Sequence, residues 1–151
     1  FTGHSLGGAM AALMTVTFPR TASITWEAPG ASLYAQRLGL HSENPKETSR
    51  FPIWNFGIST DPIFLGTCSG ITSGCYLSGY AMETKCRQGQ DCLFTLPSRL
   101  VNINTHRIEW VIENVLLKPE KFPLPTCIPA HNCTECEDWK FLTKLEDKEE
   151  L

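Results

Sequence analysis

The residues from Gly3 to Gly7 match the pattern G-x-S-x-G, in which a serine lies between two glycines. In proteins that use this pattern, the serine sits on a strained turn between a buried strand and a helix. Small residues are expected two positions before and after it, because neighbouring backbones crowd the turn. The helix that begins at Leu6 points its positive end at the serine. We therefore predict that Ser5 is a nucleophile for acyl transfer and that the backbone N–H of Leu6 donates to the oxyanion.

A serine hydroxyl is a weak nucleophile at neutral pH and needs a base, and the chain offers four histidines. His4 is adjacent to Ser5 on the same turn and cannot swing onto its neighbour's oxygen. His41 precedes the best candidate acid in a polar segment, and His131 lies in a cysteine-rich segment. His106 lies at the start of the last long predicted helix, where a fold of this type places its base. We predict His106 for this role, with a polar helix-start residue as the alternative.

The base in turn needs an orienting carboxylate, which lies between the serine and the histidine in the chain order of this fold. Asp61 follows a mostly apolar strand predicted at 53–58, so it would lie at the carboxyl edge of the sheet, on the same side as the serine. Glu83 and Asp91 fall in the same interval but lie in a Gly-, Ser- and Cys-rich segment. Asp61 is the predicted acid, and a turn residue before Pro62 is the alternative.

Alternating helical and extended patterns predict the elements that must position these side chains. Apolar residues at helical spacing indicate helices, whereas strict alternation or a short apolar run indicates a strand. We predict helices at 6–18, 31–39 and 104–117, and strands at 24–28, 53–58 and near 93–94. This order predicts an α/β fold with a mostly parallel sheet. The serine motif ahead of the first helix is typical of the α/β-hydrolase type, of which we expect the chain to cover the C-terminal half.

The 151 residues are enough for one domain with a sizeable core, and their composition changes along the chain. Residues 1–118 are predicted to form the C-terminal part of the hydrolase domain, with a disulfide-stapled insertion at 66–92. Residues 119–144 are rich in proline and cysteine, and residues 145–151 form an acidic tail. Both segments are predicted to lie outside the folded domain.

Seven cysteines indicate an oxidising compartment, where disulfides persist. Asn132 begins a glycosylation sequon, which fits a secretory lumen. Cys133 and Cys136, with His131 nearby, have zinc-ligand spacing, but no second pair of this kind is present, so we predict disulfides and no metal or other cofactor. The net charge is −3 without a basic stripe, which argues against nucleic acid as a partner.

Beyond the serine motif, four stretches resemble the autophagy-related vacuolar lipases of fungi, which are class 3 lipases of the α/β-hydrolase fold. The resemblance covers nearly the whole chain, and the block at 79–86 is far more specific than the serine motif. The stretches are 60–63, 79–86, 105–108 and 133–139. Carried over by position, the resemblance implies that Ser5 is the nucleophile, Asp61 the acid and His106 the base of a serine lipase.

The resemblance also implies a cellular setting that composition could not show. Members of this family are glycoproteins with one N-terminal membrane anchor, and they travel through the ER and multivesicular bodies to the vacuole. There they hydrolyse phospholipid or triacylglycerol esters and break down the membranes of autophagic bodies. We therefore expect a lipid substrate, a membrane surface as a partner and residence in the secretory pathway.

Two other functions stay open: a different esterase of the same class that acts on polysaccharide esters, and a non-catalytic, cysteine-stapled binding module. The chain opens directly before the serine motif, so we expect upstream sequence that carries the anchor, the lid, the first strands and a second oxyanion donor. Loss of one such donor lowers the rate by about 100- to 1,000-fold, so we expect these residues alone to be nearly inactive.

Overall fold

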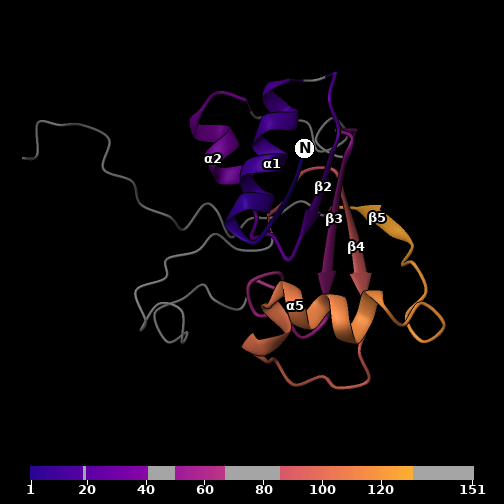
Figure 1. The fold of residues 1–151 in the computed structure, drawn as a ribbon. Helices are drawn as coiled ribbons and strands as arrows, with labels where there is room; N and C mark the ends of the chain where they lie inside the picture. The colour runs from indigo at the N-terminus through magenta and orange to yellow at the C-terminus, as the bar shows by residue number, and fades with distance from the viewer. Residues whose placement is uncertain (19, 41–49, 67–85, 131–151) are drawn as a thin grey trace, which may run out of the picture.

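The computed structural model describes residues 1–18, 20–40, 50–66 and 86–130. Within them, one sheet has the strand order β1-β2-β3-β4-β5 (Figure 1). The strands are β1 (Thr2–His4), β2 (Ser23–Trp26), β3 (Ile53–Ile58), β4 (Gln90–Phe94) and β5 (Cys127–Pro129). Neighbouring strands pair in parallel from β1 to β4, and β5 pairs antiparallel to β4. The predicted α/β class with a mostly parallel sheet is confirmed.

Helical segments lie beside the sheet and beyond one of its edges. Figure 1 shows α1 and α2 to one side of the strands, with α5 across the carboxyl ends of β3 and β4. The segments are α1 (Leu6–Thr17), α2 (Ser32–Arg37), the 3-10 turn η1 (Ile103–His106), α5 (Ile108–Val111) and the π-helical turn η2 (Ile112–Leu116). Within the described residues, no helix is long and apolar enough to cross a membrane.

The central strand β3 is buried on both faces, as parallel sheets between two layers require. Ile53 packs against Ala12 and Val16 of α1. Because side chains alternate along a strand, the even-numbered positions of β3 face the other layer. That face contributes to a second core cluster, which joins β3 and β4 to α5 and η2. Its buried members are Phe56, Ile58, Cys92, Phe94, Val111 and Val115.

The last predicted helix is interrupted, which changes the setting of the candidate base. η1 ends at His106, and Arg107 then adopts an extended backbone with φ −73° and ψ 128° before α5 begins. The Asn102 side chain holds the turn by accepting a hydrogen bond from the Asn104 N–H at 3.0 Å. Local bonds of this kind compete with a continuous helix. His106 therefore lies in a separate turn ahead of the helix.

Two predicted boundaries are wrong. β4 begins at Gln90 and pairs with β3, so the predicted insertion at 66–92 ends before this strand. The proline- and cysteine-rich segment, predicted to lie outside the domain, contributes β5 to the sheet edge. β2 is present, but Ile24 is 45% exposed and its polar neighbours Ser23 and Thr25 are the buried ones. Ile24 therefore did not mark the covered face of that strand, whereas Trp26 packs against the core cluster of β3 and β4.

Several predictions concern residues outside the described ranges. They include the polar segment at 41–49, most of the insertion, and the acidic tail. They also include glycosylation at Asn132 and the disulfide partners of Cys133 and Cys136. Two of the three histidines rejected as bases, His41 and His131, lie outside the described ranges as well. These predictions stay as stated from the sequence.

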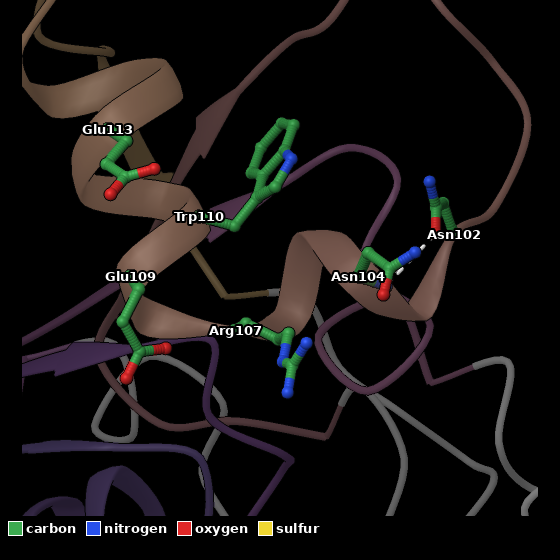
Figure 2. Close-up of a pocket in the computed structure, with 6 residues that line it drawn as sticks. All are labelled: Asn102, Asn104, Arg107, Glu109, Trp110 and Glu113. Atoms are coloured by element: carbon green, nitrogen blue, oxygen red, sulfur yellow. Dashed lines mark hydrogen bonds between the residues drawn. The ribbon is translucent and has the colours of Figure 1, made fainter.

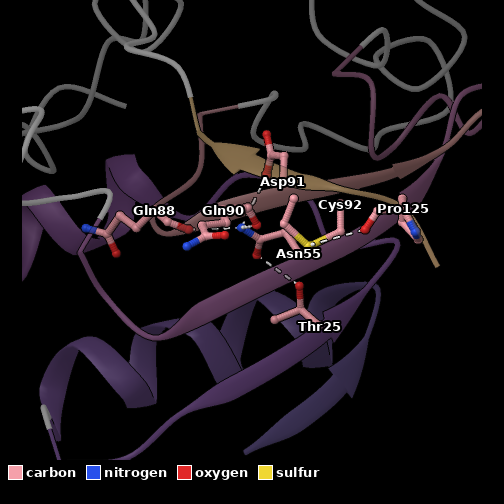
Figure 3. Close-up of a disulfide and its surroundings, with 8 residues drawn as sticks. Thr25, Asn55, Gln88, Gln90, Asp91, Cys92 and Pro125 are labelled. Atoms are coloured by element: carbon pink, nitrogen blue, oxygen red, sulfur yellow. Dashed lines mark hydrogen bonds between the residues drawn. A yellow bond between two sulfur atoms is a disulfide. The ribbon is translucent and has the colours of Figure 1, made fainter.

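A buried polar network links the three central strands (Figure 3). The Thr25 hydroxyl donates to Asn55 Oδ1 at 3.0 Å, and Asn55 Nδ2 donates to the carbonyls of Gln88 at 2.9 Å and Gln90 at 3.2 Å. A buried amide without partners would destabilise the fold, whereas a satisfied one fixes the relative positions of its neighbours. The network therefore helps to set the register of β2, β3 and β4.

A disulfide joins Cys92 of β4 to Cys127 of β5 across 35 positions (Figure 3). Cys92 is fully buried in the core cluster. Cys86 is disulfide-bonded as well. The disulfides predicted from the cysteine content are therefore present among the described residues.

Replacement of Cys92 and Cys127 by alanine together is expected to destabilise the full-length protein by about 3–4 kcal/mol, because the bond restricts the unfolded chain over a long loop. Thermal unfolding under non-reducing conditions measures the change. The matched control is the wild-type protein after mild reduction, which should lose at least as much stability because Cys86 is reduced too. Unchanged stability of the double variant would show that this bond adds nothing to the fold.

Candidate active site

Three side chains form one chain of hydrogen bonds near the carboxyl ends of the parallel strands. Ser5 Oγ lies 2.8 Å from His106 Nε2, and His106 Nδ1 lies 2.9 Å from Asp61 Oδ2. The imidazole thus contacts a hydroxyl with one nitrogen and a carboxylate with the other. In this arrangement an imidazole can accept the hydroxyl proton while the carboxylate holds the Nδ1–H. The structure therefore brings together the three residues predicted from the sequence; their catalytic roles stay a prediction.

Ser5 occupies the predicted turn between β1 and α1. Its backbone has φ 55° and ψ −129°, and residues other than glycine rarely adopt a positive φ of this kind. Such a conformation costs on the order of 1–3 kcal/mol and persists where the surroundings enforce it. Here the Ser5 N–H donates to the Trp26 carbonyl at 2.9 Å, which extends the pairing of β1 and β2 up to the serine. The turn presents the hydroxyl to His106.

The predicted crowding around the turn holds on one side only. A Cβ on Gly3 would overlap the Gly7 carbonyl and lie 2.8 Å from the Gly8 nitrogen. A Cβ on Gly7 would meet nothing within 4 Å, so the expected steric need at this position is wrong. The second tight position is Gly8, where a Cβ would lie 2.8 Å from Ala28 Cβ and 2.9 Å from the Gly3 carbonyl. At Gly8, α1 therefore packs too closely against Gly3 and Ala28 to leave room for a side chain.

Leu6 is the first residue of α1, a helix of 12 residues. The first N–H groups of a helix have no partner inside it, and together they carry a partial positive charge. The Gly8 and Ala9 N–H groups donate to the Ser5 carbonyl at 2.9 and 3.2 Å. The Leu6 N–H lies at the helix end beside Ser5, and its role as an oxyanion donor stays a prediction.

Asp61 is fully buried and receives donors on both carboxyl oxygens. The Ile63 N–H donates to Oδ1 at 2.9 Å, and His106 contacts Oδ2. Burial by itself would raise the pKa of Asp61, but hydrogen bonds from His106 and Glu27, the charge of His106 and the Ile63 N–H together hold this pKa below its ordinary range. The carboxyl beside His106 is therefore ionised.

Glu27 is a second buried carboxyl at the same sheet edge, and no sequence pattern singled it out. It follows β2, is fully buried, and has a left-handed φ of 48°. Its Oε2 accepts from the Ile58 N–H at 3.2 Å, and its carboxyl interacts with the buried carboxyl of Asp61. Burial, followed by the hydrogen bond and charge of Asp61, raises the pKa of Glu27 to about 10, although the Ile58 N–H and Arg87 lower it in part.

Arg87 is the buried cation near these carboxyls. Its guanidinium donates to the carbonyls of Ala28 and Phe64, lies 3.8 Å from the centre of the Phe64 ring, and pairs with Asp91 at 3.7 Å. Burial lowers the pKa of Arg87, and nearby carboxyls, Asp91 first, partly offset this effect. Asp91, one of the alternative acids, therefore pairs with Arg87, whereas Asp61 is the carboxylate at His106.

His4 does not act on Ser5 but contacts the candidate base. His4 Nε2 lies 2.6 Å from the backbone carbonyl of His106, and the two rings are 4.9 Å apart between centres. This bond links the end of β1 to η1, which carries His106. The position of His4 in the sequence was enough to reject it as a base. Its contact with η1 could not be predicted from the sequence and is seen only in the structure.

A hollow of about 580 Å³ lies along η1 and α5, with Trp110 between the acidic and amide side chains (Figure 2). Ser5 does not line it, so it is separate from the hydrogen-bonded chain described above. Its lining residues are Asn102, Asn104, Arg107, Glu109, Trp110 and Glu113. Among the described residues, no cluster of histidine, cysteine and acidic side chains could hold a metal ion.

Known proteins are similar in sequence to this chain over nearly its whole length. A protein of Candida glabrata named "Putative lipase ATG15" is 43% identical over 97% of the chain, and proteins of the same name from Eremothecium gossypii and Saccharomyces cerevisiae are 40% and 42% identical over 93% of it. The chain is related to the fungal ATG15 proteins. It spans 29%, 26% and 27% of these three relatives, so less than a third of each. No family model and no solved structure matches it.

Substitution of Gly3 by alanine is expected to destabilise the full-length protein by about 3 kcal/mol or more, because the new methyl group overlaps helix backbone that cannot move alone. Gly7→Ala is the matched control, four positions away on the same motif, and should stay within about 1 kcal/mol of wild type. Thermal unfolding of both variants measures the difference. Equal losses at the two positions would contradict the steric assignment.

Proposed function

We propose that this protein is a serine lipase that hydrolyses carboxylic esters of phospholipids or neutral lipids through Ser5, His106 and Asp61. The observation that carries the proposal is the unbroken hydrogen-bond chain from the strained serine to a buried, ionised carboxylate. The names of the relatives support a lipid ester as the substrate. An imidazole between a hydroxyl and a carboxylate is the arrangement that acyl transfer by serine needs.

The reaction proceeds in two acyl transfers. As Ser5 Oγ attacks the ester carbonyl, His106 Nε2 takes its proton, and the Asp61 carboxylate stabilises the imidazolium through Nδ1–H. The Leu6 N–H donates to the oxyanion, and His106 then protonates the departing alcohol oxygen. Water attacks the acyl-serine with His106 again as base, which releases a fatty acid and restores Ser5.

Exposed apolar side chains beside the reacting groups support a lipid surface as the partner. Leu6, next to the nucleophile, is 64% exposed, and Ile103, in the turn that carries His106, is 55% exposed. Leu100 and Val101, just before that turn, are exposed as well. Apolar side chains gathered near a site favour contact with lipid or with another apolar surface.

The cellular setting is part of the same proposal. Disulfides at Cys86 and Cys92 support passage through an oxidising lumen. We place the full-length protein in the secretory pathway, with the vacuole or multivesicular body as its destination and the membranes of autophagic bodies as its substrate. This destination follows from the family resemblance of the sequence.

A fluorophosphonate probe tests the nucleophile. The full-length wild-type protein should be labelled at Ser5, and Ser5→Ala should lose labelling and lower ester turnover by roughly a million-fold, as triad knockouts do. Ser98→Ala, at an exposed serine, is the control and should behave as wild type. Labelling that survives in Ser5→Ala, or is absent in wild type, would remove Ser5 from this role.

A substrate panel separates lipase from esterase. The wild-type protein is offered phospholipid vesicles, a triglyceride emulsion and a feruloyl polysaccharide ester at equal ester concentration, and released acid is measured. We expect hydrolysis of one or both lipid substrates at least about tenfold faster than of the feruloyl ester, because the apolar surface beside Ser5 binds acyl chains and not sugars. Preference for the feruloyl ester would identify a polysaccharide esterase.

A further inference from the structure

The Glu27 side chain replaces a backbone carbonyl as hydrogen-bond acceptor at the point where β2 ends. The Glu27 N–H still donates to the Phe56 carbonyl at 2.8 Å, as a parallel ladder requires. The next bond of that ladder would run from the Ile58 N–H to the backbone carbonyl of Glu27. Instead, the left-handed turn at φ 48° brings the Glu27 side chain to this N–H, with Oε2 at 3.2 Å. Backbone strain therefore holds a carboxyl at the end of β2.

The contact between Glu27 and Asp61 requires a proton. Two ionised carboxylates cannot share a buried contact, because their repulsion is strong where water is excluded. Asp61 already accepts from the Ile63 N–H and from His106, and both donors favour its charged form. Glu27 Oε1 receives no donor among the described residues, although it is buried. The proton therefore belongs on Glu27, and Oε1 is the oxygen free to carry it.

We propose that Glu27 is a positioning residue of this site, whose protonated carboxyl donates to the Asp61 carboxylate and holds it against His106 Nδ1. Its kinetic consequence rests on the proposed function, whereas the location of the proton does not. Asp61 in turn orients the imidazole that contacts Ser5. A carboxylate fixed by three donors cannot rotate away from Nδ1. Loss of that orientation strongly lowers kcat in enzymes that use a serine, a histidine and a carboxylate.

Other charged groups around Glu27 favour one distribution of charge. Asp61 faces it from beyond β3, with His106 of η1 on the far side of that carboxylate. Arg87, ahead of β4, is the nearby cation, but its guanidinium donates to two carbonyls and pairs with Asp91. Arg87 therefore has other partners, and Glu27 stays neutral beside an ionised Asp61. The raised pKa of Glu27 agrees with this distribution.

Two substitutions of similar size separate donation from packing. Glu27→Gln keeps an N–H donor for Asp61 and an oxygen for the Ile58 N–H, whereas Glu27→Leu keeps only volume; both place a non-glycine residue at the same strained φ. In the full-length protein with a soluble ester, Glu27→Gln should keep kcat within about threefold of wild type. Glu27→Leu should lower kcat by at least about tenfold, yet less than the ~10,000-fold loss when the orienting carboxylate is removed, with KM little changed.

Stability against pH reports the proton itself. The folded protein keeps a proton on Glu27 that the unfolded chain releases near its ordinary pKa. The stability that Glu27 contributes is therefore fully present below that value and declines as pH rises toward the raised one. Relative to Glu27→Gln, which has no proton to keep, the wild-type unfolding equilibrium should shift toward unfolding by about tenfold per pH unit between about pH 5 and 9. This comparison holds even where Glu27→Leu fails to fold.

Three results would overturn the proposal. One is parallel stability curves for wild type and Glu27→Gln, which would mean an ionised Glu27 compensated by Arg87. Another is equal kcat for Glu27→Gln and Glu27→Leu, whether both are active or both slow. The third is absence of ester hydrolysis by wild type, which contradicts the proposed function and its positioning residue together; a pH difference in that case still places the proton on Glu27.

Discussion

The site depends on one constraint of parallel sheets: the carboxyl ends of neighbouring strands meet at one edge. Ser5 follows β1, Glu27 follows β2 and Asp61 lies just beyond β3, so three side chains from distant parts of the chain converge there. η1, which follows β4, brings His106 to the same edge. The pairing of the strands therefore sets the spacing of Ser5, Glu27 and Asp61 along this edge.

Burial of charge at this edge explains the groups around the hydrogen-bonded chain. An ionised Asp61 away from water needs donors on every side, and it has them from Ile63, His106 and Glu27. Ser5 and Glu27 are the two non-glycine residues with positive φ among those described, and both lie at this edge of the sheet. Strain concentrated in this way is typical of functional sites, where the surrounding structure enforces it.

Much of the site could be predicted from the order and placement of residues. The serine turn, a carboxylate after a buried strand and a histidine near a late helix are local patterns, and the structure brings Ser5, Asp61 and His106 together. Other features arise from packing. Gly8 has no room for a side chain because α1 meets Ala28. The start of β4 and all of β5 were missed because cysteine-, glycine- and proline-rich segments resemble loops.

Glu27 shows why the rest could not be predicted. It follows a strand just as Asp61 does, but a charged residue at a strand end is ordinarily exposed. Only its complete burial and its contact with Asp61 distinguish it. The interruption at Arg107 could not be predicted either, because the apolar spacing of the following residues predicts one continuous helix. That spacing carries no information about the hydrogen bond that Asn102 accepts in the turn before it.

The most direct test of the central claim is a crystal structure of the full-length protein after reaction with a phosphonate ester. The account predicts phosphorus bonded to Ser5 Oγ, His106 Nε2 within hydrogen-bond distance of the adduct, and Nδ1 still on Asp61. An adduct on another side chain, or a His106 ring turned away from both Ser5 and Asp61, would contradict it.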